Sequence, residues 1–183
     1  MTLELHTQRL RLTPLTGDDA QALFSYRRLP EVTRFQNFVP AGVADAEAFI
    51  ASVQGRDLGA SDQWCQLAVR LRETDELVGD VGVQRMSHGA KQAEIGFTVA
   101  PSHQRRGLAM EAVTALLGHL FGELDLHRVT ASVDPENVGS CALLERLGMR
   151  REAHHVRSYW FRGAWVDDVV YAMLRTEWSN ARP

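Results

Sequence analysis

The chain has 183 residues, of which 45% are apolar and 23% are charged. This length fits one globular domain, and the composition excludes disordered, collagen-like and coiled-coil proteins. Twenty Lys and Arg residues against 23 Asp and Glu residues give a formal charge of −3, so the whole molecule does not attract nucleic acid or an anionic membrane. We therefore expect a single domain over residues 1–183 that binds any anionic ligand through a local site.

The cysteine usage and the apolar runs give two further expectations. Cys65 and Cys141 are too far apart in the sequence for a metal knuckle or a redox pair, and we interpret both as reduced packing residues. No apolar run reaches the length of about 18 residues that a membrane helix needs, and the first residues lack the apolar core of a signal peptide. The sequence predicts a cytoplasmic protein with no metal.

The first half of the chain begins with one strand and two helices. Alternating leucines predict a strand that ends at Pro14, and residues 16–19 offer capping groups for a helix that ends near Arg28. A second helix is predicted over residues 44–58. Alternating apolar residues then predict three strands, at residues 63–71, 76–85 and 91–99.

In the second half, the period of apolar residues changes after Pro101 to that of a helix, which is predicted to end near Gly122. A strand at 128–133 and a helix at 137–147 follow. Two strands complete the chain, at residues 150–161 and 168–175. This order predicts the α/β (α+β) class, with a mixed sheet that carries helices on both faces.

Residues 97–109 are the most informative segment, because a strand here leads through a turn into a helix. Gly107 and Ala109 are small residues at the helix start, so ligand oxygens can approach the free backbone N–H groups. The helix dipole favours an anion, and Arg105 and Arg106 add positive charge. The segment predicts a phosphate site; a structural glycine beside two solvated arginines is the alternative interpretation.

The helix at 137–147 starts with two polar residues. Asn137 is well placed to cap this helix, and Ser140 lies in the first turn on nearly the same side. Asn137 can act purely as a cap, or it can present its amide to an extended ligand beside the sheet. The sequence leaves both interpretations open.

Four blocks, in their order and spacing, resemble the GNAT superfamily of N-acetyltransferases, and within it the branch of the ribosomal-protein N-terminal acetyltransferases. The blocks are Thr7–Leu12, Gln104–Ala109, Asn137–Gly148 and Trp160–Tyr171. The resemblance implies a central, mixed, mostly antiparallel sheet that splays apart between helices on both faces. It also implies direct transfer of an acetyl group from acetyl-CoA to a primary amine, on a protein N-terminus or a small molecule.

The resemblance also implies which residues bind acetyl-CoA. Its pyrophosphate would lie on the backbone amides of Gln104, Arg105, Arg106, Gly107, Leu108 and Ala109. Its pantetheine arm would follow the strand end formed by Phe97, Thr98 and Val99, and Asn137 would contact it. The Thr7–Leu12 block, here called the first-strand block, and the Trp160–Tyr171 block would frame the acceptor side.

The loop between the first two helices is a candidate lid over the acceptor. It contains Phe35 and Phe38, which we expect to contact the amine substrate; simple packing of both rings is the alternative. A homodimer, formed through the last strands, is a further implication of the resemblance.

Glu94 is the candidate base for the implied reaction, because an ammonium must lose a proton before it attacks a thioester. On the alternating strand it points to the face opposite Ile95 and Phe97. A solvent-facing carboxylate is the alternative interpretation. The oxyanion donor of the family is a backbone N–H, here near Val99.

The group that protonates the departing thiolate is less clear. Many relatives have a tyrosine seven residues after the asparagine, where this chain has Leu144. Ser140 is the remaining candidate. The departure at Leu144 also supports a rival hypothesis, an acyl-CoA-binding sensor that has lost catalysis.

The other carboxylates carry structural interpretations. Glu111 and Glu145 lie inside predicted helices and are interpreted as solvated side chains. Asp167 and Asp168 precede a predicted strand and are interpreted as turn residues.

Overall fold

The computed structural model describes residues 3–56, 58, 62–86 and 91–180, and an eight-stranded sheet forms its centre. The strand order is β1-β2-β3-β4-β5-β6-β8-β7, in which β5 and β6 are parallel and all other neighbouring pairs are antiparallel. The strands are β1 (Leu5–His6), β2 (Leu10–Pro14), β3 (Trp64–Leu71), β4 (Leu77–Arg85), β5 (Gln92–Val99), β6 (Arg128–Val133), β7 (Arg150–Phe161) and β8 (Ala164–Leu174).

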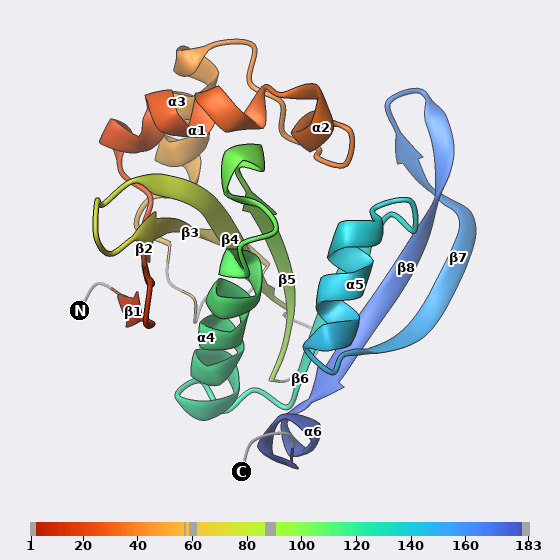
Figure 1. Ribbon diagram of the computed structural model, residues 1–183. Helices are drawn as coiled ribbons and strands as arrows, with labels where there is room; N and C mark the ends of the chain where they lie inside the picture. The colour runs from red at the N-terminus through yellow and green to blue at the C-terminus, as the bar shows by residue number, and fades with distance from the viewer. Residues whose placement is uncertain (1–2, 57, 59–61, 87–90, 181–183) are drawn as a thin grey trace.

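Helices cover both faces of this sheet (Figure 1). One face carries the first three helices, and the other carries α4 and α5, with α6 beyond the end of β8. The helices are α1 (Ala20–Arg27), α2 (Pro30–Thr33), α3 (Val43–Val53), α4 (Leu108–Gly122), α5 (Val138–Arg146) and α6 (Arg175–Asn180), with short 3-10 turns η1 (Gly17–Asp19) and η2 (Pro101–His103).

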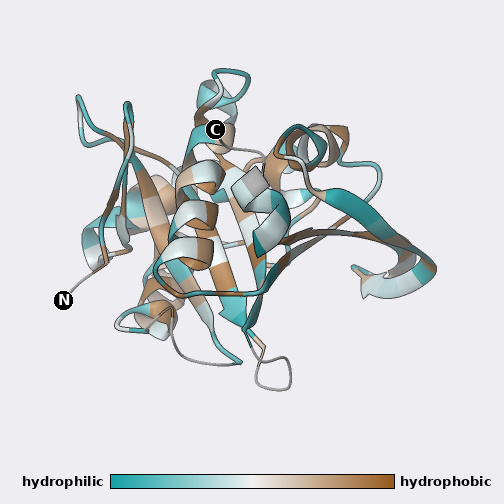
Figure 2. Cartoon of the chain, turned by 90° about the horizontal axis from the view of Figure 1, so that it is seen from below, coloured by the Kyte–Doolittle hydropathy of each residue, from teal (hydrophilic) through white to brown (hydrophobic). Residues whose placement is uncertain are grey.

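Each face has its own hydrophobic core, because the alternating strands send successive side chains to opposite sides. The larger core packs α4 and α5 against the sheet, and Leu116, Leu117 and Leu120 of α4 are fully buried in it. The smaller core packs α1 and α3 against residues such as Ala68 of β3. In Figure 2 the hydrophobic residues, in brown, concentrate on the central strands and on the sides of the helices that face them.

The mixed sheet, the helix after Pro101 and the central strands are confirmed. Three short elements were not predicted, namely β1, α2 and α6, because two to six residues carry too little periodicity. The helix predicted over residues 44–58 corresponds to α3, which ends at Val53, before the predicted Leu58. β8 begins at Ala164, before the predicted start, because most of its first residues are only partly buried and show no alternation.

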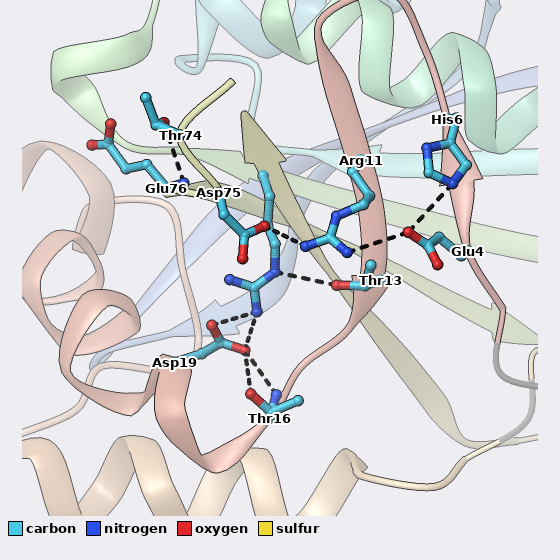
Figure 3. A network of polar contacts seen from close by, with 10 residues as sticks. Glu4, His6, Arg11, Thr13, Thr16, Asp19, Thr74, Asp75 and Glu76 are labelled. Carbon is cyan, nitrogen blue, oxygen red and sulfur yellow. Dashed lines mark hydrogen bonds and ion pairs between the residues drawn. The ribbon is translucent and has the colours of Figure 1, made fainter. Parts of the chain in front are cut away.

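A network of polar side chains joins the first helical layer to the edge of the sheet (Figure 3). Arg70 of β3 forms an ion pair with Asp19, at 2.6 Å, and its Nε donates to Thr13 Oγ1. The Asp19 carboxylate also accepts hydrogen bonds from the backbone N–H and the hydroxyl of Thr16. The start of α1 is therefore held on β2 and β3 by a nearly buried charge pair.

We expect the Asp19→Ala variant to lose about 3 to 5 kcal/mol of unfolding free energy, because it leaves the Arg70 guanidinium nearly buried without its carboxylate partner. Urea denaturation measures the change. Arg11→Met is the matched control: it breaks the pair with Asp75, which is exposed and contributes little. Equal losses in both variants would contradict the role of the Arg70 pair.

Candidate active site

A cleft of about 530 Å³ lies on the face of the sheet that carries the first three helices. Its walls come from β3 to β6, the loop after α2, α3, the start of α5 and the β7–β8 hairpin. The cleft brings together three predicted groups: the candidate base Glu94, the helix-start residues Asn137 and Ser140, and the loop phenylalanines. These groups are far apart in the sequence.

The sheet is open beside this cleft. β5 and β6 pair only through three residues each, and the pairing stops at Glu94 opposite Thr130. In the antiparallel pairing with β4, the Ala100 N–H donates to the Val78 carbonyl, so the N–H groups of the alternate residues Phe97 and Val99 point away from β4 and toward the gap. The Val99 carbonyl at this edge does accept a hydrogen bond within the chain, from Gln104 Nε2 at 2.9 Å. The Phe97 and Val99 N–H groups are therefore backbone donors for a ligand in the gap between β5 and β6.

The segment after β5 leads to the start of α4. Glu111 is the first residue of this helix whose backbone N–H donates within the helix region, to the Gly107 carbonyl at 3.1 Å. The three preceding N–H groups have no acceptor within the helix. Gly107 has a φ of 78°, which an L side chain rarely adopts, and Arg105 has a φ of 59°. Residues 104–107 are exposed, and this arrangement fits a diphosphate anion.

The first-strand block holds this helix start in place. The Thr7 hydroxyl, the Arg9 backbone N–H and the Arg9 Nε all donate to the Glu111 carboxylate, at 2.5 to 2.8 Å. Arg9 Nη1 also donates to the Arg106 carbonyl, at 2.9 Å. This block therefore contacts the start of α4 and does not line the cleft, and the interpretation of Glu111 as a solvated carboxylate is wrong. Strand pairing places β2 next to α4, which the local sequence could not reveal.

The pKa of Glu111 reflects this environment. Partial burial acts to raise it, but the hydrogen bonds from Thr7 and Arg9 outweigh the burial and lower the pKa. Glu111 therefore stays ionised and keeps Arg9 beside the helix start at neutral pH.

Asn137 caps α5, as the sequence predicted for one of its two possible roles. Its Oδ1 accepts from the Ser140 backbone N–H, at 3.2 Å. Both side chains also line the cleft, so the cap does not remove them from the site. Leu144, one turn further along, is fully buried and borders the same cleft.

Glu94 is half-buried in the cleft, and Asp168 of β8 lines the same space. Burial raises the pKa of Glu94, and the negative charge of Asp168 raises it further. Asp168 is held by the Ser132 hydroxyl, which donates to its Oδ1 at 2.5 Å. A carboxyl with a raised pKa beside a second carboxylate is suited to accept a proton.

The interpretation of Asp167 and Asp168 as turn residues is wrong, because both lie inside β8 and line the cleft. Asp167 Oδ2 lies 2.6 Å from His154 Nε2, and its Oδ1 accepts from the Arg157 backbone N–H. Glu145 is exposed on α5, as expected, and it also accepts from the buried Tyr171 hydroxyl at 2.9 Å. Sequence position alone gave no signal for these contacts.

Phe35 and Phe38 are half-buried and line the cleft, and Phe38 also stacks on Phe49 of α3 with ring centroids 4.4 Å apart. Their loop is tied to the opposite wall of the cleft. Asn37 Nδ2 donates to the Tyr159 hydroxyl, at 2.7 Å. Arg34 pairs with Glu136, at 2.6 Å. The loop therefore bridges the cleft from the helical layer to the hairpin.

A family model described as an acetyltransferase (GNAT) domain matches residues 9–150. The chain belongs to the GNAT acetyltransferase family. The uncharacterized N-acetyltransferase p20 of Bacillus licheniformis is 33% identical over 178 residues, which cover 96% of this chain and 98% of that relative. A crystal structure of a GNAT-family acetyltransferase from Bacillus anthracis superposes with a TM-score of 0.84 and 27% identity, over 95% of this chain and 99% of that one.

A third relative agrees with the predicted branch. The [ribosomal protein uS5]-alanine N-acetyltransferase of Escherichia coli is 29% identical over 108 residues, 58% of this chain and 56% of that relative. These relatives carry the names of N-acetyltransferases, so this GNAT chain is an acetyltransferase, and the sensor hypothesis finds no support.

The described residues contain neither a candidate metal cluster nor a helix suited to cross a membrane. No group of three or more His, Cys, Asp and Glu side chains among them is arranged to hold a metal ion. None of the helices in that part of the chain is long and apolar enough to span a membrane.

Proposed function

We propose that this GNAT enzyme transfers the acetyl group of acetyl-CoA directly to a primary amine in a ternary complex. The observation that carries the proposal is the position of Glu94: a half-buried carboxylate with a raised pKa, in a cleft where β5 and β6 stop pairing. The same strand β5 leads to a helix start with free N–H groups and a glycine at φ 78°. One strand thus connects a candidate base with a candidate diphosphate site.

The residues that would hold acetyl-CoA follow from this arrangement. The amides of residues 104–109 bind the pyrophosphate, helped by the charges of Arg105 and Arg106. The edge formed by Phe97, Thr98 and Val99 binds the pantetheine arm through its free backbone groups, and Asn137 and Ser140 contact the arm from α5. When bound, acetyl-CoA supplies a thioester that an amine can attack.

Three groups of the chain serve the reaction. Glu94 removes the proton from the acceptor ammonium, directly or through an ordered water. The Val99 N–H stabilises the negative charge on the carbonyl oxygen. Ser140 donates a hydrogen bond to the departing sulfur, since Leu144 offers no proton. No nucleophilic side chain is needed, because the amine attacks directly.

The acceptor is either the N-terminal amine of a protein or the amine of a small molecule, and the loop that contains Phe35 and Phe38 closes over it. The name of the Escherichia coli relative, which acts on a ribosomal protein, supports the first. In this proposal the protein is one cytoplasmic domain that neither binds nucleic acid nor contacts a membrane. Its last strands form a homodimer interface; Trp160 and Trp165, each 57% exposed in the hairpin, support it.

Titration with CoA is the first test of this function. A ligand that binds only the folded state stabilises it, by about 2.7 kcal/mol when its concentration is 100 times Kd. We therefore expect CoA to raise the Tm, and a thiol-release assay with acetyl-CoA to report turnover with at least one primary amine. No thermal shift and no heat of binding would contradict the donor site, and binding without turnover of any amine would contradict the transferase.

A further inference from the structure

Aromatic side chains gather in the cleft. The chain has 14 Phe, Trp and Tyr residues, and seven of them line the cleft from the loop after α2, from α3, from β3, from β5 and from the hairpin. These seven are Phe35, Phe38, Phe49, Trp64, Phe97, Tyr159 and Phe161. Because they come from five separate segments, no single local pattern in the sequence accounts for the cluster.

Trp64 forms the floor of the cleft beside the candidate base. Gly82 of β4 and Gly96 of β5 are paired across the sheet, and both lie on the same face as Trp64. A Cβ atom on Gly82 would lie 3.0 Å from Trp64 Cε3, and one on Gly96 would lie 3.8 Å from Trp64 Cζ3. The indole therefore lies across the two glycines. Gly96 is two residues from Glu94 on one strand, so the ring and the carboxylate share one surface.

The charge of the cleft is negative beside these rings. Of the arginines that line it, Arg27 is buried in an ion pair with Asp80, and Arg56 donates to the Trp64 carbonyl at 2.9 Å. Glu94 and Asp168 both line the cleft, with no arginine or lysine paired to either in the hydrogen bonds and ion pairs of the described chain. This combination suits one positive charge next to an apolar body.

From this geometry we infer that the acceptor is an arylalkylamine, a primary amine carried on an aromatic ring through a short chain. Its ammonium faces Glu94 and Asp168, while its ring packs against Trp64 and the loop phenylalanines. The inference rests on the proposed function and names its substrate class. A polyamine fits less well, because it has no ring to pack against these aromatic side chains.

The test compares primary amines in the thiol-release assay with acetyl-CoA. The panel contains phenethylamine, hexylamine, spermidine and a short peptide that begins with alanine. We expect kcat/KM for phenethylamine to exceed that for each of the other three by about tenfold or more, corresponding to about 1.4 kcal/mol or more. A preference for spermidine or the peptide, or equal rates for phenethylamine and hexylamine, would overturn the inference.

Variants of Trp64 separate recognition of the ring from a structural role. Trp64→Leu should raise KM for phenethylamine about tenfold, raise KM for hexylamine much less because leucine still packs against an alkyl chain, and leave the CoA affinity nearly unchanged. Trp64→Phe should restore the preference. Phe24→Leu is the matched control, because Phe24 lies on α1 and does not line the cleft. Equal losses for both amines in Trp64→Leu would contradict ring recognition.

The outcomes also distinguish this inference from the function on which it rests. If CoA binds and another amine of the panel is acetylated in preference, the arylalkylamine is wrong and the N-acetyltransferase stands. If CoA does not bind, or no amine is acetylated, both are wrong.

Discussion

The Gly107→Val variant is expected to lose measurable binding of CoA while it keeps its fold. Gly107 stands at φ 78° immediately before α4, and a β-branched residue in this conformation is strained. Its Cβ would lie 3.4 Å from Arg9 Nη2, so the new side chain also disturbs the arginine that holds the loop. We expect Kd for CoA to rise at least about 100-fold, or about 2.7 kcal/mol.

The fold should survive this change, because the strain of about 1 to 2 kcal/mol is small against the 5 to 15 kcal/mol that stabilise a typical domain. Gly122→Val is the matched control: Gly122 ends the same helix, and no atom other than those of its chain neighbours and its own helix backbone lies within 4 Å of an added Cβ. Calorimetric titration with CoA and a thermal melt of each variant give the answer. Unchanged CoA affinity in Gly107→Val would remove the helix start from the donor site.

The Glu94→Gln variant is expected to lower kcat by about 10² to 10⁴-fold, the usual contribution of a general base. In the wild-type enzyme, activity should fall as the pH drops through the pKa of Glu94, which burial and the charge of Asp168 raise above the ordinary carboxyl value. The variant should lose this acid limb of the pH profile. Glu47→Gln, an exposed carboxylate on α3, is the matched control.

The same variant should be more stable than the wild type at neutral pH. Because the folded-state pKa of Glu94 is raised, the folded protein binds more protons than the unfolded chain between the ordinary carboxyl value, about 4.3, and the raised value. The stability contribution of Glu94 is thus present below this window and lost as the pH rises through it. We expect Glu94→Gln to raise the Tm at pH 7 and to lose this advantage at pH 4.

Asp168→Asn separates the two causes of the raised pKa. Without the neighbouring negative charge, the pKa of Glu94 falls, and the acid limb of kcat should move to lower pH. A pH profile that is identical in the wild type, Glu94→Gln and Asp168→Asn would exclude Glu94 as the base.

Strong local patterns predicted most of the fold. Alternating residues predicted the central strands, and the change of period after Pro101 predicted α4, because one buried face imposes its own spacing on the sequence. The same logic failed at Ala164, where the hairpin extends from the sheet and its first residues need no buried face (Figure 1).

The candidate site was less accessible to sequence reasoning. Capping was one of the two interpretations that the sequence left open for Asn137, because capping acts within one turn, and its Oδ1 indeed accepts from Ser140. The position of Trp64 in the cleft was missed, since it depends on two glycines from other strands. The sequence signal for it is that Gly82 and Gly96 each lie inside a strand, where glycine often marks close approach of another group.

Features that act over a few residues can be predicted from the amino-acid order: the strand and helix periods, a capping group at Asn137 and the glycine before α4. The contacts between distant groups depend on the fold, as for Thr7 with Glu111, 104 residues away, and for Asp168 with the cleft of Glu94. Such contacts are set by strand order and register. Strand pairing depends on the whole sheet, whereas local patterns record only which side of each element is buried.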